Sequence, residues 1–163
     1  PGCIKNALSA LPSDIGDLDT LIKLNIQENN IRRLPSSIGQ LTNLQEIRAD
    51  KNCLSGLPDS IGNLSSLKYL NLDCNRLHHI PSAVGRQKAL IHLSITDNSL
   101  MTLPDSIGLA KSLETIILHN NQIHSIPSSL CTNLFHLKTL ILSRNRLTNL
   151  PSSIGSLESL NCK

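Results

Sequence analysis

The stretch LIKLNIQENNIRRLPSSIGQLTNL, residues 21–44, decides the fold of this chain of 163 residues. Its alternation at Leu24 and Ile26 has the period of a short strand with the apolar side chains on one face. Asn29 follows where the chain turns off that strand. Pro35 then sets φ for a first helical turn, and apolar residues follow it at three-residue steps. The stretch therefore predicts one short strand followed by one short helical turn.

The same frame, LxxLxIxxNxIxxLP with aliphatic residues exchanging, recurs along the chain. It begins at each of six leucines: Leu21, Leu44, Leu67, Leu90, Leu113 and Leu137. Its asparagine recurs at intervals of 23, 23, 23, 23, 23 and 24 residues, at Asn6, Asn29, Asn52, Asn75, Asn98, Asn121 and Asn145. A fixed period of this length predicts a solenoid, in which each unit buries its apolar face only against its neighbours.

We therefore expect an α/β fold of the leucine-rich repeat type. It would be a right-handed superhelix with a parallel β-sheet on the concave face and short helical or 3₁₀ turns on the convex face. Residues 1–163 are predicted to form a single array of 23–24-residue repeats. Solenoids need polar capping repeats, and neither end carries one, so we expect an array truncated at both ends, a fragment of a longer protein.

The repeated asparagines are expected to be structural. A carboxamide both donates and accepts hydrogen bonds, so it can satisfy backbone groups of adjacent turns that would otherwise be buried without partners. Stacked in register, the seven asparagines predict a ladder along the solenoid rather than a catalytic site.

Three departures from the frame stand out. Ala49 replaces a large core residue of its strand, which predicts a thinner layer there. Gln87 and Ala110 replace a convex-side leucine in consecutive repeats, which predicts a looser outer face. The segment 128–137 has one extra residue, which predicts a bulge containing Cys131 or Phe135.

Composition excludes several classes of function. A net charge of +3 and a pI near 8.8 do not indicate nucleic-acid binding, which favours a clustered basic face. No apolar run approaches the roughly 18 residues of a membrane-spanning helix, so no membrane insertion is expected. The five scattered cysteines (Cys3, Cys53, Cys74, Cys131 and Cys162) form no CxxC pair and predict free thiols in a reducing compartment.

No pattern in the chain indicates catalysis. Each glycine stands singly, so no phosphate-binding loop is present, and no GxSxG motif accompanies the many serines. The six histidines do not converge with a third ligand to form a metal site. The sequence predicts no enzyme, no cofactor and no metal.

The residues that alternate with the core positions of each strand must point out of the sheet, and these vary freely between repeats. Acidic residues occupy the N-terminal part of this face, and Tyr69, Ile117 and Ile141 place apolar groups on it. Exposed apolar side chains with a polar rim are typical of a protein contact site. The predicted partner-binding residues are Glu28, Glu46, Arg48, Asp50, Tyr69, Asn71, Asp73, His92, Asp97, Ile117, His119, Ile141 and Arg144.

The segments LPSSIGQLTNL (34–44), LPDSIGNLSSL (57–67) and LPSSIGSLESL (150–160) closely resemble the leucine-rich repeats of intracellular Ras-group proteins. These include Shoc-type Ras/MAP-kinase scaffolds, Ras suppressor, erbin- and scribble-like scaffolds, and plant Ras-group relatives. The resemblance implies cytoplasmic scaffolding in signal transduction, including at the inner membrane surface through partners. Implied partners are proteins: small GTPases, phosphatase subunits or adaptor peptides.

Two alternatives stay open. Similar repeats occur beside catalytic domains, so the chain could be a recognition or autoinhibitory segment of a larger enzyme such as a kinase, Ras-like GTPase or ubiquitin ligase, or of an immune receptor. An extracellular receptor would require a signal peptide and cysteine-rich caps outside these residues.

Overall fold

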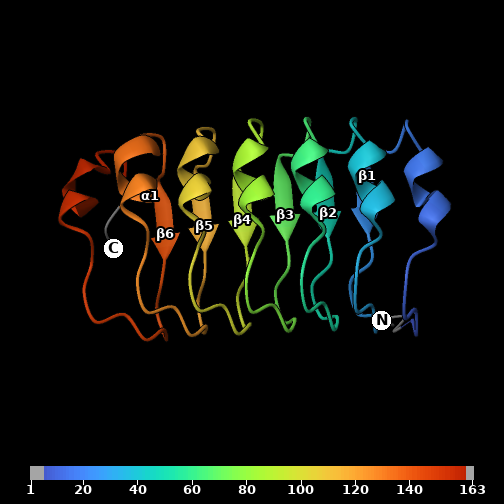
Figure 1. Cartoon of the computed structure of the whole chain (residues 1–163), viewed down its shortest axis with the longest axis horizontal. Coiled ribbons are helices and arrows are strands. Elements are labelled where there is room, and N and C mark those ends of the chain that lie inside the picture. The colour runs from blue at the N-terminus through green and yellow to red at the C-terminus, as the bar shows by residue number, and fades with distance from the viewer. Residues whose placement is uncertain (1–5, 161–163) are drawn as a thin grey trace, which may run out of the picture.

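The computed structural model describes residues 6–160. Two of the five cysteines predicted to be free thiols, Cys3 and Cys162, lie outside these described residues. Six three-residue strands stand side by side in chain order (Figure 1). They are β1 (Lys23–Asn25), β2 (Glu46–Arg48), β3 (Tyr69–Asn71), β4 (His92–Ser94), β5 (Thr115–Ile117) and β6 (Thr139–Ile141). Every neighbouring pair is parallel, as a crossover through one helical turn per repeat requires.

The helical turns form a second row that connects successive strands (Figure 1). Six are 3₁₀ turns: η1 (Ser13–Asp17), η2 (Ser36–Gln40), η3 (Asp59–Asn63), η4 (Ser82–Arg86), η5 (Asp105–Leu109) and η6 (Ser152–Ser156). A proline precedes each of them, where its fixed φ suits the start of a helical turn. The predicted leucine-rich repeat solenoid is confirmed, with the sheet on the concave face and the turns on the convex face.

The extra residue of segment 128–137 is absorbed differently from our prediction. Instead of a bulge, the turn becomes an α-helix, α1 (Ser128–Asn133). Cys131 is fully buried in the core, whereas Phe135 is 58% exposed. One added residue fits because an α-helical turn holds 3.6 residues where a 3₁₀ turn holds 3.0.

Aliphatic side chains between the two rows form one continuous core. Leu70, Leu93 and Ile116 are buried on the inner face of consecutive strands, and Ile61 and Ile107 are buried beneath the turns. The turns pack so closely that a Cβ on Gly85 would overlap the carbonyl oxygen of Ser106 in the next repeat. Glycine is required there for the close approach of two backbones.

Gln87 does not loosen the outer face as predicted. Its side chain is fully buried at the position of a core leucine, and its Nε2 donates to the Ile61 carbonyl at 2.8 Å. Its Oε1 has no hydrogen-bond partner among the described residues. Ala110, one repeat further, is also fully buried. Both substitutions are therefore accommodated inside the core.

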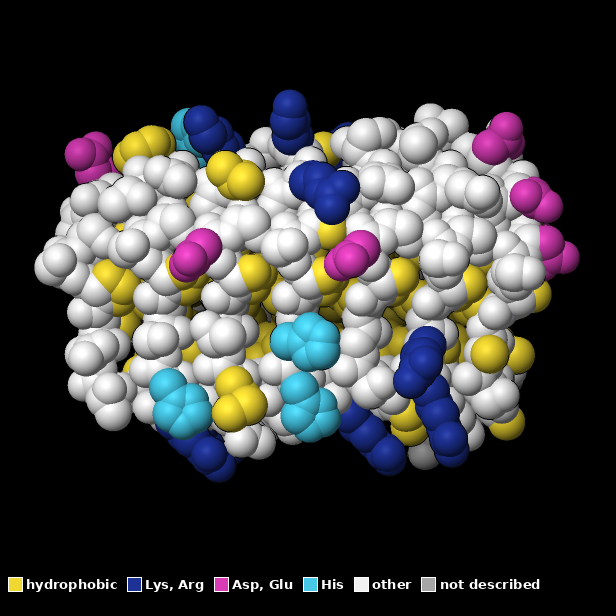
Figure 2. Space-filling view, viewed as in Figure 1, with side chains coloured by type: hydrophobic (Ala, Val, Ile, Leu, Met, Phe, Trp, Pro, Cys, Tyr) yellow, Lys and Arg dark blue, Asp and Glu magenta, His cyan; other side chains and the backbone are white. Residues whose placement is uncertain are grey.

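Basic side chains line the margins of the face on which the helical turns lie (Figure 2). Figure 2, which has the view of Figure 1, shows lysine and arginine side chains along both margins and a group of acidic side chains at the N-terminal end. No helix within residues 6–160 has the length and apolar character needed to cross a membrane.

Candidate protein-binding surface

Strand register brings side chains from different repeats into columns on the concave face. The first column joins one residue of each strand: Lys23, Glu46, Tyr69, His92, Thr115 and Thr139. The second joins the residues two positions later: Asn25, Arg48, Asn71, Ser94, Ile117 and Ile141. Residues of one column are about 4.8 Å apart along the sheet, so side chains in neighbouring repeats touch.

An aromatic cluster occupies the centre of this face. The rings of Tyr69 and His92 stack with centroids 4.6 Å apart and planes 6° from parallel. The Arg48 guanidinium carbon lies 5.6 Å from the centre of the Tyr69 ring, within range of a cation–π interaction. We call Arg48, Tyr69 and His92 the aromatic cluster. It joins three consecutive repeats without contributing to the aliphatic core.

Glu46 ties the aromatic cluster to the first repeat. Its carboxylate pairs with Lys23 at 3.0 Å and with Arg48 at 2.5 Å. The hydrogen bonds from Lys23 and Arg48 lower the pKa of Glu46, and the Glu46 carboxylate raises the pKa of Arg48. A hollow of about 240 Å³ opens between these side chains, Leu24 and Asn25.

The acidic residues predicted on the N-terminal part of the face, which we call the acidic row, are Glu28, Asp50, Asp73 and Asp97. Most of their carboxylates already have partners within the protein. Asp73 Oδ1 accepts from Ser94 Oγ at 2.7 Å and from the Thr96 N–H at 2.6 Å. Glu28 pairs with Lys51 at 2.6 Å. Asp97 accepts from Asn120 Nδ2 at 2.6 Å and from the Cys74 thiol.

Asp50 differs from the other three. Among residues 6–160, it is the one member of the row whose carboxylate makes no side-chain or backbone hydrogen bond. The structure therefore distinguishes Asp50, which is available to a basic partner group, from Glu28, Asp73 and Asp97, which also hold the face together.

Burial shifts the pKa values of Asp73 and His92, which lie near the centre of the face. Desolvation raises the pKa of Asp73, although hydrogen bonds from Ser94 and Thr96 oppose the shift. Desolvation also lowers the pKa of His92, and the negative charge of Asp73 opposes that change. His92 is thus held toward its neutral form, which stacks on Tyr69 without adding a buried charge.

The C-terminal half of the face is more apolar. Ile117 and Ile141 are paired partners in β5 and β6, and Ile141 is 38% exposed. His119 Nδ1 and Ser143 Oγ are 2.7 Å apart and share a hydrogen bond.

Asn71 lies in the second column, and its Oδ1 accepts from the Asp73 N–H at 2.9 Å.

One column has a backbone conformation that the sequence pattern did not suggest. Its residues are Glu28, Lys51, Cys74, Asp97, Asn120 and Arg144, with φ between 52° and 56°. For residues other than glycine, this left-handed conformation costs about 1–2 kcal/mol. Hydrogen bonds to the next repeat hold the conformation, as in Lys51 N–H to the Asp73 carbonyl at 2.8 Å.

The asparagines make the hydrogen bonds of a ladder. In each repeat from Asn29 to Asn145, Oδ1 accepts a backbone N–H of the preceding repeat. From Asn52 onward, Nδ2 also donates to a carbonyl of the preceding repeat. These side chains are therefore occupied by the fold.

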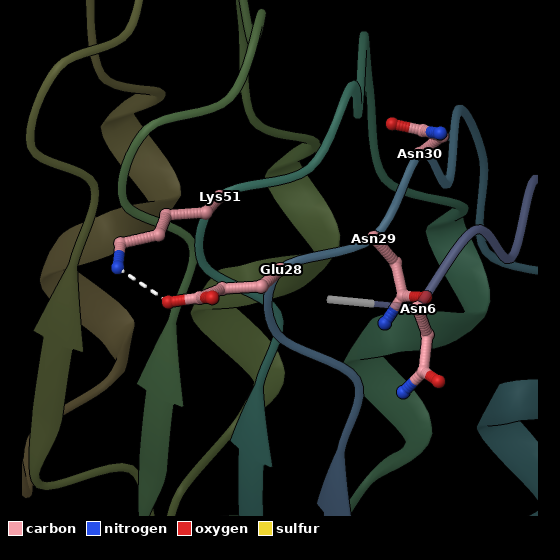
Figure 3. Close-up of a pocket in the computed structure, with 5 residues that line it drawn as sticks. All are labelled: Asn6, Glu28, Asn29, Asn30 and Lys51. Carbon is pink, nitrogen blue, oxygen red and sulfur yellow. Dashed lines mark hydrogen bonds and ion pairs between the residues drawn. The ribbon is translucent and has the colours of Figure 1, made fainter. Parts of the chain in front are cut away.

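Asn6 lies apart, in a hollow at the N-terminal end. Figure 3 shows it beside Asn29, with Lys51 and Glu28 pointing toward each other and Asn30 above. These five residues line a pocket of about 570 Å³. Because Glu28 and Lys51 pair with each other, the pocket presents amides rather than net charge.

The sequence prediction omitted three residues that shape this face: Lys23 and Lys51, which form ion pairs, and Ser94, which holds Asp73 and is 3% exposed. The 23-residue period was signal enough to find the Glu28–Lys51 and Lys23–Glu46 pairs, because residues one period apart are column neighbours. The burial of Ser94 carries no such signal.

The described part of the chain contains no group of three or more His, Cys, Asp or Glu residues able to hold a metal ion. Its free thiols are half-buried Cys53, exposed Cys74 and buried Cys131. Desolvation raises the pKa of both Cys74 and Cys131, so both stay in the less reactive thiol form.

Stacked strand-and-turn units joined by an asparagine ladder define the leucine-rich repeat class of solenoid. Comparison with protein families agrees: the family described as leucine-rich repeat region matches residues 3–76, and the family leucine rich repeat matches residues 111–161. The chain is therefore a leucine-rich repeat protein, and such repeats are typically interaction modules that bind proteins rather than enzymes. No curated protein matches the chain.

Solved structures share the fold along nearly the whole chain. A leucine-rich repeat protein of Leptospira interrogans is 39% identical with a TM-score of 0.90, covering 95% of this chain and 39% of that protein. The plant peptide hormone receptor RGFR1, in complex with RGF2, is 33% identical with a TM-score of 0.84, covering 96% and 26%. The ectodomain of the Arabidopsis thaliana receptor kinase GASSHO1/SCHENGEN3, in complex with CASPARIAN STRIP INTEGRITY FACTOR 2, is 31% identical with a TM-score of 0.78, covering 93% and 22%. The chain thus spans less than half the length of each of these proteins.

Proposed function

We propose that this chain is a protein-recognition module that binds an extended segment of a partner protein across its concave face. The aromatic cluster carries this proposal. Tyr69 is one of only two Phe, Tyr and Trp residues in the chain, and it lies on the open face rather than in the core. Tyrosine and arginine are enriched among the residues that dominate protein interfaces. A stacked pair loses little side-chain entropy on binding, since it is already ordered.

Charge on the face favours a partner with a basic group near the N-terminal side of the cluster. Asp50 has a carboxylate without a hydrogen-bond donor among the described residues, and Asp73, in the same column one repeat further, adds a second negative charge. An arginine or lysine of the partner would pair with Asp50, while two separate apolar side chains would contact Tyr69 and the Ile117–Ile141 pair.

The cellular role that we propose is a scaffold in intracellular signal transduction. Its support is the similarity of the LPxxIGxL segments to Ras-group repeats. On this proposal the protein is cytoplasmic, and its partner is a small GTPase, a phosphatase subunit or an adaptor peptide.

The test places a photo-reactive amino acid at Thr115, next to His92 in the first column, to capture the partner in cells, followed by calorimetry with the purified partner. Tyr69→Ala and Asp50→Lys should each weaken binding by at least tenfold. Asp59→Lys is the matched control, since Asp59 is an exposed carboxylate in the convex turn η3 and should not change affinity. Unchanged affinity in both concave variants would refute the proposed site.

A receptor segment is the second candidate function. Two of the similar structures are plant receptors, each solved with a second named molecule bound, which supports recognition of a peptide by repeats of this type. Counting thiols on the unfolded chain without reductant separates the candidates. Five reactive cysteines support the intracellular scaffold, whereas fewer than five support an extracellular receptor with disulfides.

A further inference from the structure

A groove opens on the convex face, away from the concave sheet. It has a volume of about 690 Å³ and is lined by Gly85, Arg86, Lys88, Leu109 and Lys111, which we call the convex groove. The size lies within the range of about 300–1,000 Å³ that is usual for ligand sites. The residues come from η4 and η5 and the segments that follow them, so two adjacent repeats form the groove.

The apolar wall of the groove is not required by the fold. Leu109 is 57% exposed, and the equivalent positions of the first three repeats carry the polar residues Asp17, Gln40 and Asn63. One repeat further, the exposed Phe135 occupies the frame position of Lys111. Exposed apolar side chains grouped at positions that are elsewhere polar are typical of contact sites.

The rim of the groove is cationic. Arg86 and Lys88 lie on one side and Lys111 on the other, whereas the positions of Lys88 and Lys111 are Asp19, Thr42 and Ser65 in the first three repeats. Figure 2 shows lysine, arginine and hydrophobic side chains along the upper margin of the middle and C-terminal repeats, and acidic side chains at both ends and on two of the middle turns. The nearest acidic side chain on the same turns is Asp105, which begins η5. Residues 82–88 and 105–111, the two turns with the short segments that follow them, therefore carry three cationic side chains and one acidic side chain.

We infer that the convex groove binds an acidic peptide segment of a partner protein, with one apolar side chain inserted against Leu109 and carboxylates paired with Arg86, Lys88 and Lys111. A hollow such as the convex groove accepts an inserted side chain, whereas binding to a flat anionic membrane would require apolar groups that protrude from the protein. Since the convex groove shares no residue with the aromatic cluster and is formed by the turns rather than the strands, the module could hold two partners at once. The inference does not depend on the function proposed for the concave face.

The experiment measures fluorescence anisotropy of a labelled synthetic peptide made of aspartate and glutamate with one central phenylalanine. We expect saturable binding that weakens with added salt. Binding should fall at least tenfold when glutamine and asparagine replace the acidic residues, and also when alanine replaces the phenylalanine. Equal binding of all three peptides would overturn the proposal.

Variants of the protein localise the site. Leu109→Asn and the double change Lys88→Ser with Lys111→Ser install residues that another repeat carries at the same positions, so the fold should be kept. Each should weaken peptide binding at least tenfold. Met101→Gln removes an apolar residue that is 53% exposed elsewhere and is the matched control. Circular dichroism verifies that each variant is folded.

Other occupants are tested in parallel. Vesicles containing phosphatidylserine should not compete with the peptide, and binding to vesicles without binding to the peptide would overturn the proposal. Sedimentation of the unliganded protein tests a second copy as the occupant. A dimer that Leu109→Asn converts to a monomer would contradict a peptide site.

Discussion

Asn75 provides the sharpest test of how the repeats are held together. Its Oδ1 accepts the Leu54 N–H at 2.9 Å, and its Nδ2 donates to the carbonyls of Ala49 and Leu72 at 3.0 Å and of Asp73 at 3.1 Å. Asn75→Ala removes all four hydrogen bonds. The consequences are unequal, because the groups that remain have different alternatives.

The three carbonyls each keep a donor. The Ala49 oxygen still accepts from Asn52, the Leu72 oxygen from Asn98, and the Asp73 oxygen from the Lys51 N–H. The Leu54 N–H keeps none, and Leu54 is fully buried. A buried donor without a partner costs about 1–3 kcal/mol, and the lost donations add about 1 kcal/mol. We expect Asn75→Ala to lower the free energy of unfolding by about 3 kcal/mol.

The assay is urea denaturation followed by circular dichroism, with the slope against urea checked for constancy. Asn43→Ala is the control, since Asn43 is exposed and donates a single hydrogen bond to the Asp19 carbonyl at 2.8 Å. Its loss should be about 0.5 kcal/mol. If the two variants lose the same stability, an unpaired Leu54 N–H is not what makes the ladder stabilising.

Three further predictions follow from burial and close packing. Gln87→Leu should raise the free energy of unfolding by about 1 kcal/mol in the same assay, because it removes a buried Oε1 that has no hydrogen-bond partner. The Ile61 carbonyl still accepts from the Leu64 N–H in this variant. A less stable variant would contradict the prediction. Gly85→Ala should lower the free energy of unfolding by about 2 kcal/mol, because the new Cβ would overlap with Ser106. Gly56→Ala is the control: its Cβ would meet no neighbour within 4 Å, so its stability should be unchanged or slightly higher. Equal losses of stability in the two variants would refute the packing argument. Burial lowers the pKa of His92 in the folded state, so the unfolded chain binds the proton more readily and stability falls as pH drops below about 6.5. His92→Gln should therefore show a smaller loss of stability between pH 7.5 and pH 5.5, and an unchanged pH profile would exclude His92 as the group responsible.

The repeat architecture could be predicted from sequence because each structural element leaves a local signal. Leu24 and Ile26 show the strand period, and Pro35 marks the start of a turn. Repetition at 23 residues then aligns these signals, so it also assigns the columns of the sheet. This is why the positions of Arg48, Tyr69 and His92 on one face could be predicted, although their stacking could not.

Side-chain competition explains what the sequence could not reveal. The acidic row looked like one surface, but Asp73 and Asp97 are engaged by Ser94 and Asn120, and only distances between atoms separate them from Asp50. The sequence predicted a looser outer face at Gln87, whereas the core encloses its side chain completely.

The sequence by itself determined the leucine-rich repeat solenoid, its strand order and the faces on which its side chains lie, since a period of 23 residues carries that information directly. The tertiary structure decided which of those side chains are already engaged. It also revealed the convex groove between Arg86 and Lys111, because a groove is a volume bounded by two repeats. The size of that volume depends on how closely the repeats pack, which no single repeat encodes.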